Sequence, residues 1–582
     1  MFTTRPELTG TFGMVASTHW LASSTGMAVL ERGGNAFDAA TAAAFVLHVV
    51  EPHLNGPGGE VPAIFVGSGD PEPRVLCGQG VAPRAATIEQ FHALGLELVP
   101  GTGLLAATVP GAVGAWLTLL RDHGTKPIGE ILSYAIGYAE GGHHAVPRVL
   151  ETIGAVERLF AEEWTTSAEL WLPVAQPLRN RPLAATYQRL VDEAEAAGPG
   201  REAQLDAAIK TWYEGFVAEA IDKFCRTPVL DDSGERHTGL LTGHDCAGWR
   251  PGYETPVSLD THGWTVYKVG PWCQGPVLLQ QLAMLEALGE LPAPGSAELV
   301  HRITEVAKLA FADREAWYGD VPGVSLDALL SPDYARRRAA LVTEQASLEL
   351  RPGSPDTTPP RLPRYLTEHR APVIPLVRTG GLGEPTVSQY GDTCHIDVAD
   401  RWGNMISATP SGGWLQSSPA VPGLGFCLGT RAQMFWLEEG LPASLEPGKR
   451  PRSTLTPSFA RRDGRAMAFG TPGGDQQDQW QLGFFLNHAA FGMDLQASID
   501  APAWHTTAFP SSFYPRQSAP GEIVVESRVD GAAVAELERR GHRVVRSEPW
   551  SLGRLSAVTR DDDGMLRAAA NPRGMQGYAV GR

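Results

Sequence analysis

Apolar residues recur at helical spacing along most of the first half of the chain. Residues 19–32 show this spacing and stop at Gly33-Gly34, a pair that suits the end of a helix. Asn35 follows, and its side chain can cap the free amides of a second helix that runs to about Glu51. Asp38 falls in the first turn of that helix, beside the positive end of its dipole. The pattern therefore predicts two consecutive helices near the N-terminus.

The rest of the pattern predicts a mixture of helices and short strands. Further helices are expected over residues 112–121, most of 127–225, 278–288 and 299–317. Short apolar or alternating runs predict strands at residues 14–17, 63–66, 264–269, 395–400 and 405–409. This mixture allows an α+β fold without specifying how its layers are arranged.

A proline-rich segment precedes the strand that is expected at residues 395–400. Residues 351–385 contain eight prolines, which disfavour any regular element, and long segments of this kind are usually functional or mobile. We expect an exposed linker over residues 350–392 that leads into Thr393. A linker followed by a strand that opens with threonine is what self-cleavage would require. An ordinary interdomain linker would look the same.

Composition and charge limit the classes of partner that this protein is expected to bind. The chain has 582 residues and a net charge of −17, with no block of like charges. Because nucleic-acid binding needs clustered Lys and Arg, we expect no nucleic-acid partner. The first ten residues lack the apolar core of a signal peptide, and the apolar window 39–50 is too short to span a bilayer, so no membrane partner is expected.

Six scattered cysteines without a Cys-x-x-Cys pair predict reduced thiols in the core, and with them a cytoplasmic protein. No histidine cluster has the spacing of metal ligands. We therefore expect no metal site and no cofactor.

The Gly391-Asp392-Thr393 triplet is the first candidate for chemistry. Most such triplets only begin a hairpin strand. A threonine that becomes a new chain terminus can, however, use its own amine as the base that activates its hydroxyl. The unperturbed pKa of an α-amine is about 8, so part of it is neutral near neutral pH. Cys394 is a second conceivable terminal nucleophile, although adjacent strand residues point to opposite faces.

Six short motifs occur along the chain in this order: Gly33-Gly34-Asn35-Ala36-Phe37-Asp38-Ala39-Ala40, Val50-Glu51-Pro52-His53, Gly56-Pro57-Gly58-Gly59, Lys308-Leu309-Ala310-Phe311-Ala312-Asp313-Arg314, Gly391-Asp392-Thr393-Cys394-His395 and Thr471-Pro472-Gly473-Gly474. In these motifs and their order the chain resembles the γ-glutamyltransferase (glutathione hydrolase) family of N-terminal nucleophile hydrolases. The resemblance runs from about residue 10 to the end.

The resemblance implies an α+β fold of the N-terminal nucleophile hydrolase type, a four-layer αββα sandwich formed jointly by two self-cleaved subunits. Cleavage between Asp392 and Thr393 would separate a large subunit, residues 1–392, from a small subunit, residues 393–582, which carries the nucleophile. Each subunit would be the other's partner. A homodimer of two such processed heterodimers is compatible with this organisation, and the sequence leaves the oligomeric state open.

The resemblance also implies roles for particular residues around Thr393. Gly473 and Gly474 match a glycine pair whose backbone amides stabilise an oxyanion, and Ser411 keeps the hydroxyl that normally follows the nucleophile by eighteen residues. Ser453 and Thr454 match a pair of hydroxyl residues that holds the substrate carboxylate. A tight turn at the glycines, and capping or turn hydrogen bonds at Ser453 and Thr454, are the structural alternatives.

Two positions depart from the family's pattern. Gln79 stands where an arginine normally clamps the α-carboxylate of a γ-glutamyl group, and Gln433 stands where an aspartate normally holds its ammonium. Glutamine supplies no charge at either place. If this placement slips, Arg84 or Arg431 could provide a cation instead. The polar run Gly474–Trp480 is also atypical, and we hypothesise that it lines a different acyl pocket.

These observations predict a self-processing threonine-nucleophile amide hydrolase or acyltransferase that acts through a Thr393 acyl-enzyme. Its substrate would be a small amide, either glutathione or another γ-glutamyl amide. The alternative within the family is an amidohydrolase or acylase for a small non-glutamyl amide of the oxamate type. An unprocessed, non-catalytic binding homologue is the alternative from another class, and retention of Thr393, Ser411 and the glycine pair argues against it. The sequence does not determine the balance of hydrolysis over transfer.

Overall fold

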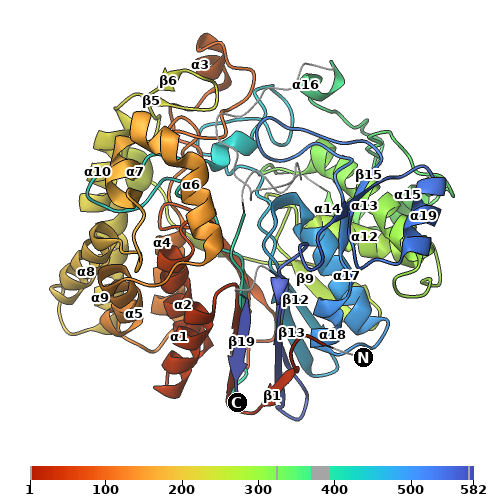
Figure 1. Cartoon of the computed structure of the whole chain (residues 1–582), viewed down its shortest axis with the longest axis horizontal. Coiled ribbons are helices and arrows are strands. Elements are labelled where there is room, and N and C mark those ends of the chain that lie inside the picture. The colour runs from red at the N-terminus through yellow and green to blue at the C-terminus, as the bar shows by residue number, and fades with distance from the viewer. Residues whose placement is uncertain (1–2, 323–324, 369–391, 574–576) are drawn as a thin grey trace.

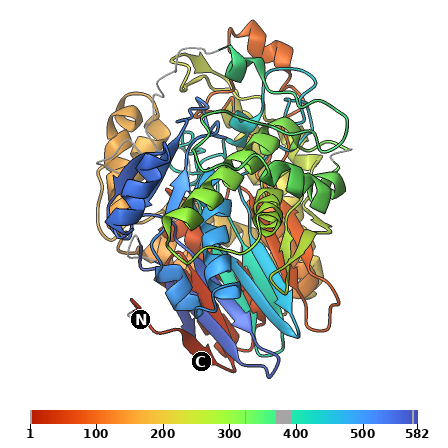
Figure 2. The same cartoon turned by 90° about the vertical axis from the view of Figure 1, so that its right-hand side faces the viewer.

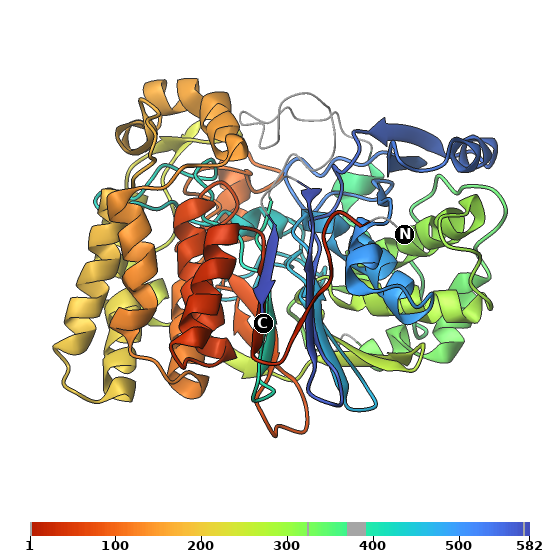
Figure 3. The ribbon, with the colours of Figure 1, turned by 60° about the horizontal axis from the view of Figure 1, so that its bottom comes forward.

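Two seven-stranded sheets lie face to face in the computed structural model, which describes residues 3–322, 325–368, 392–573 and 577–582. Figures 1 and 3 show the two sheets edge-on between an N-terminal group of helices and a second helical layer. In the first sheet the strand order is β19 (Tyr578–Gly581), β2 (Gly13–Ser17), β10 (Ile396–Asp400), β11 (Met405–Ala408), β3 (Val61–Val66), β4 (Arg74–Gly78) and β7 (Gly252–Glu254). In the second it is β1 (Leu8–Gly10), β18 (Leu566–Ala570), β17 (Ser556–Arg560), β13 (Arg465–Gly470), β12 (Ser458–Arg462), β9 (Trp264–Lys268) and β8 (Val257–Thr261).

Neighbouring strands in both sheets are antiparallel. The space between the sheets is filled by apolar side chains from both of them, including Met14, Ile64, Ala399, Phe459 and Val558. Strands that are buried on both faces read as nearly continuous apolar runs, which explains why alternation is weak in this sequence. A parallel pair, β15 (Glu522–Glu526) and β16 (Arg543–Ser547), belongs to a small separate sheet with β14 (Trp504–Thr506).

Helices cover the outer face of each sheet. On the side of β10, one apolar core joins the sheet to α1 (Trp20–Glu31), α2 (Ala36–Val50), α4 (Ala112–His123), α5 (Ile128–Gly141), α8 (Arg181–Glu195), α9 (Arg201–Glu214) and α10 (Phe216–Cys225). On the other side, a second core includes α12 (Pro276–Ala287), α13 (Ala297–Trp317), α15 (Pro332–Ala339), α17 (Gln477–Ala489) and α18 (Leu495–Asp500). Figure 2 shows α12 and α13 in green toward the viewer, in the helical layer outside this second sheet.

The remaining helices lie around this frame: α3 (Ile88–Ala93), α6 (Pro147–Glu162), α7 (Thr165–Trp171), α11 (Gly243–Ala247), α14 (Leu326–Leu329), α16 (Arg364–Thr367) and α19 (Gly531–Arg539). A short hairpin is formed by β5 (Val229–Leu230) and β6 (Arg236–His237). The predicted α+β class is confirmed. That the fold is built by two separate self-cleaved subunits stays a proposal.

The two predicted N-terminal helices are confirmed as α1 and α2. Asn35 caps α2 by accepting hydrogen bonds from the amides of Phe37 and Asp38, and the Asp38 carboxylate accepts one from the Asn35 amide at 2.8 Å. Asp38 is fully buried and also accepts bonds from Thr125 and Lys126. One carboxylate therefore joins the start of α2 to the loop before α5.

The proline-rich segment differs in part from its prediction. Its first part packs against the fold, because Gly353 donates its amide to Asp313 at 2.8 Å and its carbonyl accepts a bond from Trp317. A single helical turn, α16, begins after Pro363, where proline is the capping residue and breaks no hydrogen bond of the helix. Residues 369–391 of the predicted linker, including Gly391 of the cleavage motif, lie outside the described residues.

The six cysteines are free and buried, as predicted. Among the helices of the described residues, none combines the length and apolar character needed to cross a membrane.

Replacing Asp38 by alanine should lower the free energy of unfolding by about 3 kcal/mol, because several buried donors would lose a charged acceptor together. The measurement is the midpoint of thermal or urea unfolding. Asp206→Ala is the matched control, since Asp206 is 62% exposed and pairs with Arg121 at the surface. That control should change stability by no more than about 1 kcal/mol, and equal effects of the two substitutions would contradict the assigned role of Asp38.

Candidate active site

Thr393 lies immediately before β10, at the end of a central strand. It forms a bridge to Ser411, which in turn forms a bridge to Glu60 in the loop before β3. The glycines of that loop are needed for this close approach, because a Cβ on Gly59 would come within 2.1 Å of the Ser411 carbonyl oxygen. The predicted pair, Thr393 and Ser411, is therefore brought together by backbone pairing.

A short chain of hydroxyl groups connects the Thr393 side chain to the peptide bond before it. Thr393 Oγ1 donates a hydrogen bond to Ser411 Oγ at 3.3 Å, and Ser411 Oγ donates to the carbonyl oxygen of Asp392 at 3.0 Å. Both side chains are buried, with Thr393 and Ser411 each 1% exposed. The arrangement polarises the Asp392 carbonyl while it orients the threonine hydroxyl beside it.

A buried ion pair holds Ser411 in place. Arg431 Nη2 donates to Ser411 Oγ at 3.1 Å, and the same guanidinium is paired with the Glu60 carboxylate through Nε at 2.7 Å. Because both charges are almost fully buried, each needs the other. Arg431, which the sequence offered only as a replacement cation, thus contacts Ser411, the partner of Thr393, and Glu60 neutralises it.

Arg554 is a site residue that sequence reasoning missed. Its guanidinium forms an ion pair with the carboxylate of Asp392, and its backbone amide donates to Thr471 Oγ1 at 2.9 Å. The Asp392 carboxylate also accepts a bond from the Thr393 amide at 2.9 Å. Arg554 belongs to none of the recognisable motifs, and it follows an ordinary Leu-Gly pair, so no local signal marks it.

Cys394 points away from this chain of hydroxyls. Its thiol donates to Glu51 at 2.9 Å and accepts from Asn55 at 3.2 Å, both on the helical side of the sheet. Burial and the neighbouring Glu51 carboxylate raise the pKa of the thiol well above its usual value. This geometry favours Thr393 over Cys394 as the nucleophile, as the alternation of strand residues predicts.

Gly473 and Gly474 form the turn between β13 and α17. Their φ angles are +129° and +55°, and a Cβ on Gly473 would meet the Trp480 ring at 2.1 Å, so this turn requires glycine. Among the hydrogen bonds of the described residues, neither glycine's N–H serves as a donor. The turn also faces the positive end of α17 (Gln477–Ala489). It can therefore receive a developing negative charge.

Asp475 anchors the residue that follows this turn. Its carboxylate pairs with Arg314 of α13 and accepts bonds from the Ser512 hydroxyl at 2.6 Å and amide at 2.8 Å. Burial opposes ionisation of Asp475, but Arg314 and Ser512 hold its pKa below the usual value. Arg314, at the end of the Lys308–Arg314 motif, thus holds the residue that follows the glycine turn.

Ser453 and Thr454 lie next to the same turn. The Ser453 backbone exchanges hydrogen bonds with Trp272 and Gln274, and the Gln274 side chain donates to the Gly474 carbonyl at 3.3 Å. Ser453 Oγ accepts the Leu455 amide, whereas Thr454 Oγ1 is buried without a partner among the described residues. Thr454 is therefore the member of the pair that is free to bind a ligand.

Gln433 is occupied by the fold, whereas Gln79 is occupied only in part, because its Oε1 is buried without a partner among the described residues. Gln433 donates to Gly101 and Thr430 at 3.1 Å and accepts the Tyr514 amide at 3.0 Å. Gln79 is fully buried and donates to the carbonyl of Gly80. Neither offers a charge to an amino-acid end of a substrate.

The polar run Gly474–Trp480 serves largely as internal support. Asp478 pairs with Lys268 at 3.0 Å, and Gln479 exchanges two hydrogen bonds with the Thr506 backbone. Gln477 Nε2 remains buried without a partner in the described part of the chain. Asp478 Oδ2 and Trp480 Nε1 are likewise buried without a partner there, so the hypothesis that this run lines an acyl pocket keeps these three residues.

One buried trio could in principle hold a metal ion, namely His301, Glu305 and His542. Its donor atoms are already engaged, because His301 and His542 share a hydrogen bond of 2.8 Å and Glu305 pairs with Lys308 and Arg351. Two cations at the carboxylate do not suit a metal ligand set.

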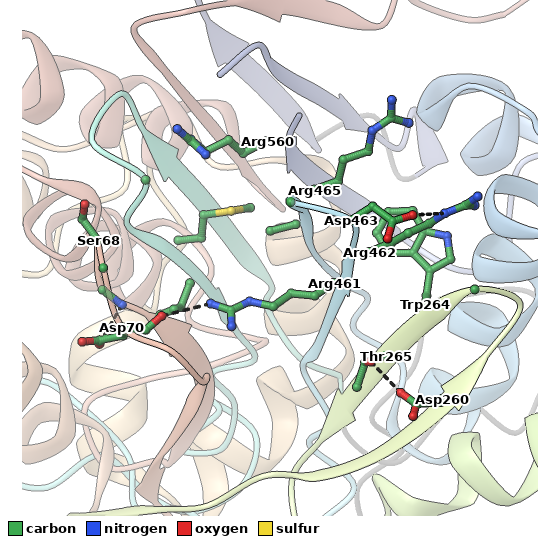
Figure 4. Close-up of a pocket in the computed structure, with 18 of the residues that line it drawn as sticks. Ser68, Asp70, Asp260, Trp264, Thr265, Arg461, Arg462, Asp463, Arg465 and Arg560 are labelled. Carbon is green, nitrogen blue, oxygen red and sulfur yellow. Dashed lines mark hydrogen bonds and ion pairs between the residues drawn. The ribbon is translucent and has the colours of Figure 1, made fainter. Parts of the chain in front are cut away.

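A cavity of about 1010 Å³ lies at the opposite ends of the strands that lead to Thr393. Figure 4 shows Arg461, Arg465 and Arg560 projecting there together with Asp70 and Asp463. Because β10 has five residues, roughly 16 Å of strand separates this cavity from the Thr393 site.

The chain is similar to known proteins over almost its whole length. The profile of the Gamma-glutamyltranspeptidase family matches residues 22–581. The chain is 30% identical over 592 residues to the oxamate amidohydrolase proenzyme of Klebsiella pneumoniae subsp. pneumoniae, which covers 98% of each protein. Among solved structures, LmbA2991HD matches with a TM-score of 0.94 at 60% identity over 100% of both chains. A cephalosporin acylase from Bacillus halodurans matches with a TM-score of 0.82 at 28% identity, covering 100% of this chain and 97% of that one.

The fold and the relatives define an enzyme of the hydrolase class. The chain belongs to the gamma-glutamyltranspeptidase family, as the resemblance predicted.

If the amides of this turn stabilise an oxyanion, Gly473→Ala should lower amide-hydrolysing activity at least about 100-fold, because the added methyl group collides with Trp480 and displaces them. Gly483→Ala is the matched control: it lies within α17, and a Cβ there meets no atom within 4 Å. The control should keep full activity and gain about 0.5–1 kcal/mol of stability. Unchanged kcat in the Gly473 variant would contradict the oxyanion role.

Proposed function

We propose that this protein is a self-processing amide hydrolase that uses Thr393 as its nucleophile. The observation that carries the proposal is the chain of hydrogen bonds from Thr393 Oγ1 through Ser411 to the Asp392 carbonyl. It aims a hydroxyl group and a donor at one peptide bond, which is the arrangement that acyl transfer at that bond requires.

This geometry supports self-cleavage at the bond between Asp392 and Thr393. Thr393 Oγ1 attacks the Asp392 carbonyl carbon, a C–O bond forms, and the C–N bond between Asp392 and Thr393 breaks. The proton of the hydroxyl ends on the released nitrogen, which becomes the α-amine of Thr393. Water then hydrolyses the ester, restores the hydroxyl and leaves a carboxyl group on Asp392. The products are a 392-residue large subunit and a small subunit of 190 residues, 582 minus 392.

The processed enzyme would repeat the same chemistry on a substrate amide. The free amine of Thr393 serves as the base, its hydroxyl accepts the acyl group, and the substrate amine departs. Ser411 and the amides of Gly473 and Gly474 supply donors for the oxyanion. Water, or a second amine, then releases the acyl group. No residue of this scheme needs a cofactor.

Two observations favour a non-glutamyl amide of the kind handled by amidohydrolases and acylases over a γ-glutamyl compound. Gln433 uses its whole amide group within the fold, and Gln79 is buried and bonded to the backbone beside it. Arg431 does not replace the missing cation, because Glu60 neutralises it. A zwitterionic amino-acid end would therefore find no charged partner at these positions.

Thr393→Ala should leave the purified chain intact, whereas wild-type protein should yield two fragments with Thr393 as the new terminus. Thr393→Ser keeps the hydroxyl and should still be cleaved. Ser411→Ala should slow cleavage about 100-fold, because the Asp392 carbonyl loses its donor. Denaturing mass analysis over a time course measures all four proteins. A wild-type chain that stays whole, or a terminus at Cys394, would contradict the proposal.

Processed wild-type enzyme should turn over γ-glutamyl anilides weakly, with kcat/KM at least about 100-fold below that for its best non-glutamyl amide. The reason is the loss of two charge-assisted contacts at Gln79 and Gln433. Anilide release followed by absorbance measures the rates. Efficient turnover with a low KM would show that other groups bind the glutamyl end.

A further inference from the structure

Arg554 is held at the site by contacts that do not involve Asp392. Its amide donates to Thr471 Oγ1, and the preceding carbonyl of Gly553 accepts a bond from Asn571 at 2.6 Å. Both Thr471 and Asn571 are buried. The residue also stands just before β17, a strand in the middle of its sheet. Cleavage of the chain at Thr393 would therefore leave the Arg554 backbone where it is.

The ion pair of Arg554 is made with the residue whose carbonyl is attacked in self-cleavage. The Asp392 carboxylate contacts the Arg554 guanidinium with one oxygen and the Thr393 amide with the other, at 2.9 Å. The Arg554 side chain is only 17% exposed. In the uncleaved chain, an anion thus bridges the nitrogen of the nucleophile and a largely buried cation.

Cleavage removes the covalent bond that keeps this anion in place. Asp392 becomes the end of the large subunit, while Arg554 stays anchored beside Thr393. The Glu51 carboxylate also interacts electrostatically with Arg554, but it already accepts hydrogen bonds from Thr18 and Cys394. A guanidinium that is largely buried is costly to leave without an anion in direct contact. The processed site therefore favours a substrate that brings its own negative charge to Arg554.

We propose that Arg554 binds a carboxylate on the acyl part of the substrate, and that Asp392 is the internal template for it. In Asp392 the carboxylate carbon is three carbon–carbon bonds from the carbonyl carbon that Thr393 attacks. The matching substrates are monoamides of a four-carbon dicarboxylic acid, that is, N-succinyl amides. This inference rests on the proposed function, since it requires that Thr393 attacks both carbonyls.

The number of bonds between the carboxylate and the attacked carbonyl distinguishes N-succinyl amides from amides of related acids. A γ-glutamyl group carries its carboxylate four carbon–carbon bonds from the attacked carbonyl, and it bears an ammonium on the adjacent carbon, which Arg554 would repel. A glutaryl group has the same length without the ammonium. The oxalyl group that oxamate would transfer has its carboxylate carbon bonded directly to the attacked carbonyl carbon, which is too close to span the distance that Asp392 spans.

The test uses processed wild-type enzyme and three p-nitroanilides with succinyl, glutaryl and butyryl acyl groups. The succinyl and butyryl compounds have the same chain length and differ in the carboxylate. We expect kcat/KM for the succinyl compound to exceed that for the butyryl compound by about 10- to 100-fold, because a hydrogen-bonded ion pair is gained. The glutaryl compound should fall between them.

Arg554→Met should reduce the succinyl-to-butyryl ratio of kcat/KM to about one, and Arg554→Lys should retain part of it. Arg560→Met is the matched control. Arg560 ends the same strand and lines the cavity at its far end, so its substitution should leave the ratio unchanged. A ratio that survives in Arg554→Met would overturn the inference.

Arg554 variants can also fail to cleave, because Arg554 holds Asp392 in the uncleaved chain. Inhibition of the wild-type enzyme provides the second measurement. Succinate should inhibit anilide hydrolysis competitively and at least about 10-fold more strongly than its monomethyl ester or butyrate. Equal turnover of succinyl and butyryl anilides, or equal inhibition, would overturn the inference and leave the proposed function intact. A wild-type chain that neither cleaves nor hydrolyses any anilide would overturn both.

Discussion

The antiparallel pairing of β10 with β2 and β11 positions everything else in this site. Residues Ile396–Asp400 pair with Gly13–Ser17 on one side and, through Ile396–Ala399, with Met405–Ala408 on the other. This register carries Thr393 across from Ser411 and turns Cys394 toward Glu51 on the opposite face. A shift of one residue would exchange the two faces and present a buried thiol in place of the hydroxyl. Register thus decides which of two adjacent nucleophilic residues meets the catalytic partners.

Buried ion pairs make the site rigid. Arg431 and Glu60 hold Ser411, and Arg314 and Asp475 hold the turn after Gly474. Such pairs add little net stability compared with apolar packing, but removing one partner leaves an unpaired charge at considerable cost. In this site the two ion pairs serve to hold other groups in position. The first pair fixes the Ser411 hydroxyl 3.0 Å from the Asp392 carbonyl oxygen, and the second fixes the position of the glycine turn.

If the chain is processed as proposed, one cation has different partners before and after cleavage. In the intact chain Arg554 forms an ion pair with Asp392. The proposed cleavage breaks the covalent bond that keeps Asp392 beside it. Asp392, the residue before the proposed nucleophile, would then resemble the substrate both in its chemical groups and in its position at the site. This links the specificity of the enzyme to the residue at which it cuts itself, through a single arginine that both reactions use.

The sequence by itself determined the main elements, the family and the candidate nucleophile with its hydroxyl partner. Asn35, Asp38 and the apolar spacing around them predict α1 and α2 because capping and helical periodicity are local properties. Thr393, Ser411 and the glycines at 473 and 474 stand in motifs of fixed spacing, so the order of residues is enough to name them.

The roles of Gln433 and Arg554 are not local in this sense. The Gln433 side chain is hydrogen-bonded to Gly101 and Tyr514, and Arg554 contacts Asp392, which lies 162 residues away in the sequence. Such contacts form only when the two sheets pack together. Tertiary structure alone decides which charges are neutralised and which await a ligand, because that depends on neighbours distant in the chain.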